Sequence, residues 1–116
     1  MHIGIQGELL ASTFLEREGY TILEKNWRYQ RAEVDIICRK EGVLVFVEVK
    51  SRTSDYLGDP IEAVGRNKQK HIIRAADAYV KQDVEFDEIR FDIVGVIINR
   101  KGQRVEHIQD AFYPTL

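Results

Sequence analysis

Residues 43–50 form an apolar run that ends in two charged side chains, and this run constrains the fold more than any other segment. Side chains of a strand alternate between its two faces, so Glu48 and Lys50 share one face while the valines at odd positions share the other. Residues 33–38 are also rich in β-branched side chains, and the polar, glycine-containing stretch 39–42 has the composition of a turn. The sequence therefore predicts two antiparallel strands over residues 33–50.

The position of the turn fixes which residues lie opposite one another in this hairpin. If the turn is centred on Lys40 and Glu41, Glu33 lies opposite Glu48 and Cys38 lies opposite Val43. A slip of one residue would drive the acids into the valine face, which disfavours that register. One face then carries Val34, Ile36, Cys38, Val43, Val45, Val47 and Val49, and the other carries Ile37, Leu44, Phe46, Glu33, Asp35, Glu48 and Lys50. Three carboxylates and one ammonium therefore meet at the far end of the hairpin.

Like charges opposite one another destabilise a sheet, so this acidic cluster needs compensation. Lys50 offsets one charge, and a divalent cation such as Mg²⁺ (or Mn²⁺) would offset two more, since Mg²⁺ takes one or two protein carboxylates and keeps several waters. The alternative is a solvated strand end whose acids pair with Lys50, Arg52 and Arg31. We favour the metal site because the face changes from apolar to charged within one strand pair.

The chain of 116 residues is predicted to form a single domain over residues 1–116. No apolar run approaches the roughly 20 residues that span a bilayer, and the N-terminal residues lack a signal-peptide pattern, so we expect a cytoplasmic protein without membrane contact. The lone Cys38 agrees with a reducing compartment and with plain packing. A net charge of −2 argues against tight, indiscriminate DNA binding, but it leaves room for a locally basic groove.

Apolar spacing and turn residues predict the order αβββαββ. A mixed β-sheet of about five strands flanked by helices is the natural packing for this order, which places the chain in the α/β class. Residues 51–60 form a polar loop that is a candidate for substrate contact, and one helical turn is expected between Asp59 and Gly65. The expected helices cover residues 5–17 and 66–81, and the expected strands cover residues 21–29, 33–38, 43–50, 89–98 and 104–108.

Asp35 followed by Glu48-Val49-Lys50 resembles the PD-(D/E)xK nuclease signature, in which an acid at one strand end precedes acid-x-Lys on the next strand. A helix with Glu8 comes before this pair and a helix with Gln69 follows, as in restriction-endonuclease-like folds and archaeal Holliday-junction resolvases. Val34 stands where the signature has proline, which leaves the acid in position.

The chain as a whole resembles the YraN-type family of bacterial proteins, from which fold transfers better than activity. Ala32 stands where that family usually has glycine, and this change removes no ligand. The stretches that carry the resemblance are Gly7-Glu8 with Ala11, Gly19-Tyr20, Asn26-Trp27-Arg28, Glu33 to Ile37, Val45 to Arg52, Lys68, Arg90-Phe91-Asp92 and Ala111-Phe112.

The resemblance implies that Asp35, Glu48 and the backbone carbonyl of Val49 hold Mg²⁺ (or Mn²⁺), and that Lys50 orients or helps deprotonate the attacking water. Glu8 either reaches the same metal or is an acid favoured by the start of its helix. Gln69 either contacts Lys50, a water or a phosphate, or lies at the exposed start of its helix.

Basic residues near these strand ends are candidates for contact with a phosphate backbone, and Arg52, two residues beyond Lys50, is the strongest. Trp27 and Tyr29 either stack on an unpaired base or belong to the core. His71 and His107 lack a second ligand at zinc spacing, and Asp92 beside Arg90 predicts a structural salt bridge. The other basic candidates are Arg28, Arg31, Lys68, Arg66, Lys70 and Arg74.

Three functions follow from these observations. The first is a metal-dependent endonuclease that acts on DNA, including branched or junction DNA, with a homodimer expected if both strands are cut symmetrically. The second is a nucleic-acid-binding or regulatory protein that has the nuclease fold without turnover. The third is a protein-interaction module whose acids serve an interface, which predicts no metal affinity.

Overall fold

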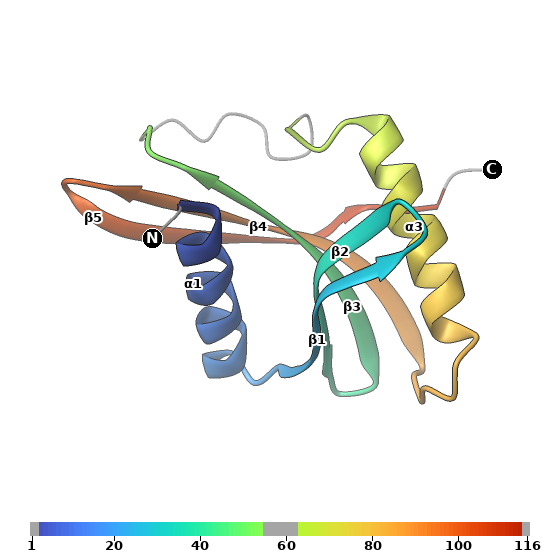
Figure 1. Cartoon of the computed structure of the whole chain (residues 1–116). Helices are drawn as coiled ribbons and strands as arrows, with labels where there is room; N and C mark the ends of the chain where they lie inside the picture. Colours follow the sequence, from blue (N-terminus) through green and yellow to red (C-terminus); the bar gives the residue numbers. More distant parts are fainter. Residues whose placement is uncertain (1–2, 55–62, 115–116) are drawn as a thin grey trace.

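The structure is a computed structural model that describes residues 3–54 and 63–114. The described elements are α1 (Ile3–Arg17), β1 (Thr21–Tyr29), β2 (Ala32–Lys40), β3 (Val43–Arg52), α3 (Arg66–Val80), β4 (Glu88–Asn99) and β5 (Gly102–Phe112). The strands form one sheet in the order β1-β2-β3-β4-β5, where β3 and β4 run parallel and every other pair is antiparallel. Helices α1 and α3 lie on either side of the sheet (Figure 1). The predicted mixed sheet and the order αβββαββ are confirmed.

Each helix covers its own apolar layer. Beneath α1, Leu15 packs with the valines of β3 that face this side, and beneath α3, Tyr79 packs with Phe46 and Phe91. Trp27 lies at the rim of the α3 layer and meets Tyr79 edge to face at 5.1 Å between ring centroids. Trp27 thus belongs to the partly buried core, which favours the core role over base stacking. None of the described helices is long and apolar enough to cross a membrane.

The β2–β3 hairpin differs from the predicted register by two residues. Ile37 lies opposite Phe46, and Lys40 opposite Val43, so the turn consists of Glu41 and Gly42. Both turn residues have positive φ, +50° and +81°. Two-residue hairpin turns need positive φ at both positions when their twist matches that of the strands. The predicted turn was centred one residue too early, on Lys40 and Glu41 instead of Glu41 and Gly42. A shift of two residues preserves the faces, but Glu33 no longer lies opposite Glu48.

Val34 lies on the opposite face from the predicted one. It packs in the layer beneath α3, whereas Ile36 packs beneath α1, so the regular alternation of β2 is interrupted between them. The β1–β2 pairs Lys25–Ile36 and Trp27–Val34 flank this point, where Asn26 adopts φ +51°. Asp35 therefore lies at an irregular point in the strand pair.

The last strand is much longer than the predicted residues 104–108. β5 extends from Gly102 to Phe112 through exposed polar residues, with an irregular register near Phe91 and Ile93 of its partner strand. Asp110 has φ +56° at this irregularity, which breaks the two-residue period by which a strand is recognised in sequence. Residues 55–62 of the predicted loop and of the predicted helical turn before Gly65 lie outside the described residues.

Candidate functional site

The candidate site lies where β2 and β3 separate, a place that we call the fork. The pairing of the two strands ends at Ile36–Val47, so Asp35 and Glu48 are the next residues on each side. Beyond this point Asp35 Oδ2 accepts a hydrogen bond of 2.8 Å from the backbone N–H of Val49. This bond fixes both the Asp35 carboxylate and the peptide of Val49, while β3 continues beside β4 as far as Arg52.

Glu48 is a buried acid with incomplete partners. Its side chain is 5% exposed, and Oε1 lies 3.7 Å from Lys68 Nζ and 4.0 Å from Lys50 Nζ, both long for direct ion pairs. Among the described residues, Glu48 Oε2 is the only buried side-chain oxygen or nitrogen without a hydrogen-bond partner. Buried polar groups in native proteins are nearly always satisfied, so this oxygen is suited to accept a cation or a hydrogen-bond donor.

The two acids resist ionisation together. Burial and the neighbouring Asp35 raise the pKa of Glu48 to about 8, against the attraction of Lys68 and Lys50. Burial also raises the pKa of Asp35, despite the opposing hydrogen bond from Val49 and the charge of Lys68. Without a bound cation the pair therefore retains a proton near neutral pH, and a divalent cation would replace that proton.

A third acid reaches the fork from α1. Asn26, with its amide oriented to suit its neighbours, donates from Nδ2 to Glu8 Oε1 at 2.7 Å and to Glu33 Oε1 at 3.0 Å. Burial, then the charges of Asp35 and Glu33, raise the pKa of Glu8. Sequence reasoning missed Asn26, although asparagine is depleted in strands and its place in β1 was a signal.

A glycine brings α1 close enough to deliver Glu8. A Cβ atom at Gly7 would collide with the side chain of Ser51 on β3, so only glycine permits this approach. The resulting hollow at the fork has a volume of about 390 Å³. It is lined by Ile3, Gly4, Glu8, Asn26, Glu33, Asp35, Glu48, Val49, Lys50 and Ser51. The structure thus brings together Glu8, Asp35, Glu48, Val49 and Lys50, as the sequence predicted.

The residues at the fork fit a magnesium-type ion. Within residues 3–54 and 63–114, no three His, Cys, Asp or Glu side chains form a ready-made metal-binding group. Mg²⁺ needs only one or two carboxylates, with waters and carbonyl oxygens for the rest. Asp35 and Glu48, with the unpartnered Oε2, meet this requirement, and Val49 lines the same hollow.

A basic hollow of about 280 Å³ adjoins the fork on the side of α3. Three of the predicted phosphate contacts, Arg28, Arg31 and Lys68, line it together with His71 and Gln30. Glu33 lines both hollows and pairs with Arg28 at 3.1 Å, which makes it a partner of the basic group as well as a neighbour of Glu8. Sequence reasoning missed Gln30 and His71, which the β1–β2 turn and α3 bring together.

Gln69 does not line the fork. Its Nε2 donates to the carbonyl of Val64 at 2.8 Å, so the amide joins the first turn of α3 to the residue before Gly65. A partly buried amide needs a partner, which had suggested a contact with Lys50, a water or a phosphate as one alternative, and Val64 meets that need at the start of the helix. Arg52 lies at the end of β3, beside Ile97 of β4, on the far side of the fork from the basic hollow.

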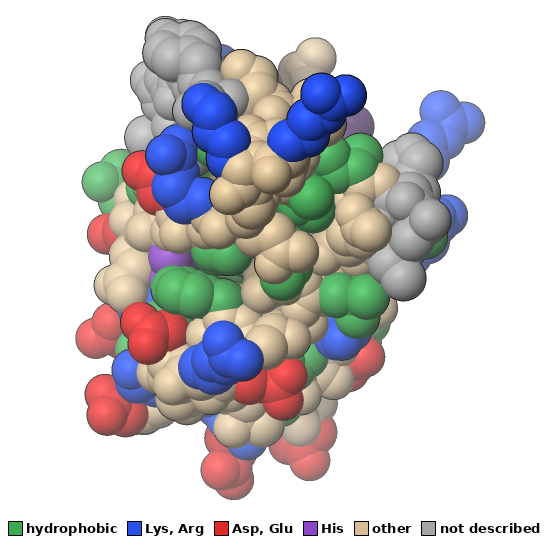
Figure 2. All heavy atoms as spheres, turned by 90° about the vertical axis from the view of Figure 1, so that its left-hand side faces the viewer, with side chains coloured by type: hydrophobic (Ala, Val, Ile, Leu, Met, Phe, Trp, Pro, Cys, Tyr) green, Lys and Arg blue, Asp and Glu red, His purple; other side chains and the backbone are tan. Residues whose placement is uncertain are grey.

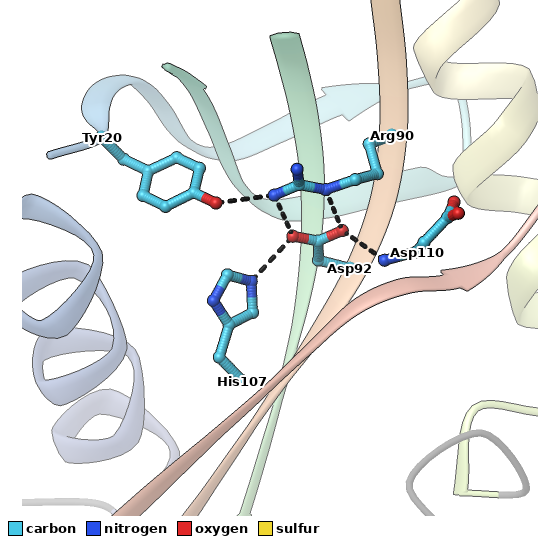
Figure 3. A network of polar contacts seen from close by, with 5 residues as sticks. All are labelled: Tyr20, Arg90, Asp92, His107 and Asp110. Carbon is cyan, nitrogen blue, oxygen red and sulfur yellow. Dashed lines mark hydrogen bonds and ion pairs between the residues drawn. The ribbon is translucent and has the colours of Figure 1, made fainter. Parts of the chain in front are cut away.

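A second buried acid lies away from the fork and is fully satisfied. Asp92 accepts hydrogen bonds from Arg90 Nε and Nη2 at 2.8 and 2.9 Å and from the N–H of Asp110 at 2.9 Å, and its Oδ2 lies 2.7 Å from His107 Nε2 (Figure 3). Arg90 also donates to the hydroxyl of Tyr20 at 2.6 Å. Burial opposes ionisation, but the hydrogen bonds from His107, Arg90 and Asp110 lower the pKa of Asp92. The predicted salt bridge to Arg90 is confirmed, and the contribution of His107 was not foreseen.

The fold and the site together define an α/β protein whose mixed sheet separates around a pair of buried acids. Residues 7–96 match the family described as Uncharacterised protein family UPF0102, and the chain belongs to this family. The YraN-type family is UPF0102, so the resemblance seen in the sequence is confirmed.

Similar proteins match over nearly the whole chain. UPF0102 protein FP2501 of Flavobacterium psychrophilum is 46% identical and covers 96% of this chain and 93% of its own. The UPF0102 protein of Chlorobium chlorochromatii is 44% identical, with coverage of 96% and 91%, and that of Bacteroides thetaiotaomicron is 45% identical, with coverage of 98% and 94%. Among solved structures, Pyrococcus furiosus SfsA in complex with Ca²⁺ aligns over 87% of this chain and 58% of that chain, at 14% identity and a TM-score of 0.33.

Proposed function

We propose that this protein is a metal-dependent endonuclease that hydrolyses phosphodiester bonds in DNA, including branched or junction DNA. The observation that carries the proposal is the unpartnered, buried Oε2 of Glu48 in a hollow that also contains Asp35 and Lys50. A carboxylate in a structural ion pair has partners for both of its oxygens. A carboxylate that binds a cation has an oxygen without a protein partner, because the cation is that partner.

Each residue at the fork has a distinct task in this mechanism. Asp35, Glu48 and the carbonyl of Val49 would hold Mg²⁺ or Mn²⁺, which when bound supplies positive charge to the scissile phosphate. Lys50, 35% exposed at the mouth of the hollow, orients the attacking water. Glu8, which accepts a hydrogen bond from Asn26, would reach the same ion or hold a water bound to it.

The basic hollow beside the fork supports a nucleic-acid substrate. Arg28, Arg31 and Lys68 present positive charge next to the acids, where a phosphate backbone that enters the fork must pass. Lys68 lies close to both groups, because its Nζ is 3.7 Å from Glu48 Oε1. The substrate phosphate and the acids are thereby held within one continuous surface.

The test uses labelled single-stranded, duplex, flap and four-way-junction DNA incubated with the protein in Mg²⁺, Mn²⁺ or EDTA. Cleavage should require the metal, and Lys50→Ala should lower the rate by at least about 100-fold, as expected when a group that orients the reacting water is lost. Lys81→Ala is the matched control, because Lys81 is exposed, pairs with Asp77 and lines neither the fork nor the basic hollow. Cleavage in EDTA, or unchanged cleavage by Lys50→Ala, would contradict the proposal.

Two further outcomes separate the finer alternatives. Binding without cleavage of any of these substrates would favour the nucleic-acid-binding protein that has the fold without turnover. If the junction is cleaved fastest, symmetrical cutting requires two sites, and light scattering of the purified protein should then show a homodimer.

A further inference from the structure

The net charge of −2 conceals a separation of charge along the molecule. One end is formed by the end of α1, the β2–β3 turn and the segment before β4, which are joined by hydrogen bonds from Lys40 to the carbonyl of Glu18 and from Asp87 to that of Gly42. On the face that Figure 2 shows, acidic side chains lie mostly over the lower half, and a group of Lys and Arg side chains lies at the top. The acids at the first end are Glu16, Glu18, Glu41, Asp83, Glu85, Asp87 and Glu88.

The opposite end carries a basic hairpin tip that sequence reasoning did not select. Asn99 pairs with Gly102, so Arg100 and Lys101 form a two-residue turn, and Arg104 follows on β5. All three basic side chains are exposed, and Glu106 is the single acid within residues 97–107. Figure 1 shows that this tip projects beyond the rest of the sheet. A hollow of about 330 Å³ at the tip is lined by Ile97, Asn99, Lys101, Gly102, Gln103 and Arg104.

Strand pairing links this tip to the fork. Arg52 of β3 pairs with Ile97 of β4, which pairs with Arg104 of β5, so the two arginines share one face of the sheet. Glu48, Lys50 and Arg52 also share that face, because they alternate along β3. The tip is tied to the end of β3 by a hydrogen bond of 3.0 Å from Asn99 Nδ2 to the carbonyl of Thr53. A basic row therefore runs from the candidate site to the hairpin tip.

The spacing of this row suits a nucleic-acid backbone. Four residues of strand separate Glu48 from Arg52, or about 13 Å, and two strand spacings of about 5 Å separate Arg52 from Arg104. Duplex DNA rises about 3.4 Å for each base pair, so Arg52 lies about four base pairs from the fork. The basic hollow with Arg28, Arg31 and Lys68 lies on the other side of the fork.

We infer that Arg100, Lys101 and Arg104 at the β4–β5 tip, together with Arg52, form a second phosphate-binding surface that holds duplex nucleic acid on the side of the fork opposite the basic hollow. The inference deepens the proposed function, and its place in catalysis rests on that function. The occupant is a polyanionic backbone rather than an acidic protein, because the positive charges follow one row across the sheet and the apolar side chain between Arg52 and Arg104, that of Ile97, is only 3% exposed.

Binding is measured by fluorescence anisotropy with a labelled DNA duplex of about 20 base pairs in EDTA, so that cleavage does not interfere. The variant R100Q/K101Q/R104Q should bind at least about 10-fold more weakly near 0.1 M salt, and the slope of log K against log salt should be shallower by about 2 to 3. The control R17Q/R39Q/K81Q removes the same charge from the acidic end and should bind like the unaltered protein. Circular dichroism and thermal melting of each variant establish that it is folded.

The outcomes separate this inference from the proposed nuclease activity. Loss of binding in the tip variant alone supports the surface, whether or not the protein cleaves DNA in Mg²⁺. Equal losses in tip and control variants, unchanged binding in the tip variant, or no binding by the unaltered protein would overturn it, even if cleavage is observed. If the tip variant lost more affinity for a labelled acidic peptide than for DNA, the tip would be assigned to a protein partner, and the inference would also be overturned.

Discussion

Two buried acids of the same sheet have opposite environments. Asp92 is fully buried and has four polar contacts, from Arg90 twice, His107 and the N–H of Asp110. Glu48 is almost as buried, yet its cations stand 3.7 and 4.0 Å away and one oxygen has no partner. The pKa of Asp92 is lowered and that of Glu48 is raised. Asp92 thus has the complete set of partners expected of a structural acid, whereas Glu48 is the acid on which the proposed cation site depends.

The largest expected effect is the loss of the Asp92 charge. Asp92→Asn should lower the free energy of unfolding by about 3–5 kcal/mol, because the fully buried acid holds the partly buried Arg90, which would lose its counter-ion. Urea denaturation followed by circular dichroism measures the change. Asp77→Asn, which breaks the exposed pair with Lys81, is the control and should change stability by less than about 0.5 kcal/mol. A loss of stability in Asp92→Asn as small as that in the control would contradict a structural role for Asp92.

Glu48→Gln should change the free energy of unfolding in the opposite direction, by stabilising the fold. The substitution keeps the shape of the side chain and removes a buried charge whose ion pairs are long and whose Oε2 has no hydrogen-bond partner, so in EDTA at pH 8 the free energy of unfolding should rise by about 1–3 kcal/mol. The same urea measurement tests it, with exposed Glu106→Gln as the control. Destabilisation by Glu48→Gln would mean that Lys50 and Lys68 already satisfy the acid, and the case for a cation site would fail.

The two substitutions should also respond oppositely to pH. The folded pKa of Asp92 lies below its ordinary value of 3.8, so its contribution is present above that pH and is lost as the pH falls through the folded pKa. The folded pKa of Glu48 is about 8 against an ordinary 4.5, so ionisation penalises the fold increasingly as pH rises through this window. The stability gap for Asp92→Asn should therefore close in acid. The gain from Glu48→Gln should grow from pH 4.5 to 8, by up to about 1.4 kcal/mol for each pH unit. Parallel curves for the two variants would contradict this assignment.

The sequence was sufficient to predict a mixed sheet, the order of its elements along the chain and the convergence of Asp35, Glu48 and Lys50. Two-residue alternation keeps these charges on one face whenever the register changes by an even number of residues. The sequence was not sufficient for features that depend on irregular backbone. The positive φ of Asn26, which accompanies the change of face between Val34 and Ile36, has no periodic signal. The contact of Gln69 with Val64 and the contact of His107 with Asp92 likewise depend on how separate elements pack.

The smallest expected effect tests the ligand itself. If Asp35 and Glu48 hold Mg²⁺, the ion at about five times its dissociation constant should stabilise the fold by about 1 kcal/mol, because it binds only the folded state. Thermal melting in rising Mg²⁺ against EDTA should show this increase for the unaltered protein and for Asp77→Asn. Asp35→Asn should abolish the increase, since it removes a charged ligand that the backbone of Val49 holds in place. An increase of equal size in Asp35→Asn would place the ion elsewhere, and the unpartnered oxygen of Glu48 would then require a different explanation, such as a donor brought by the substrate.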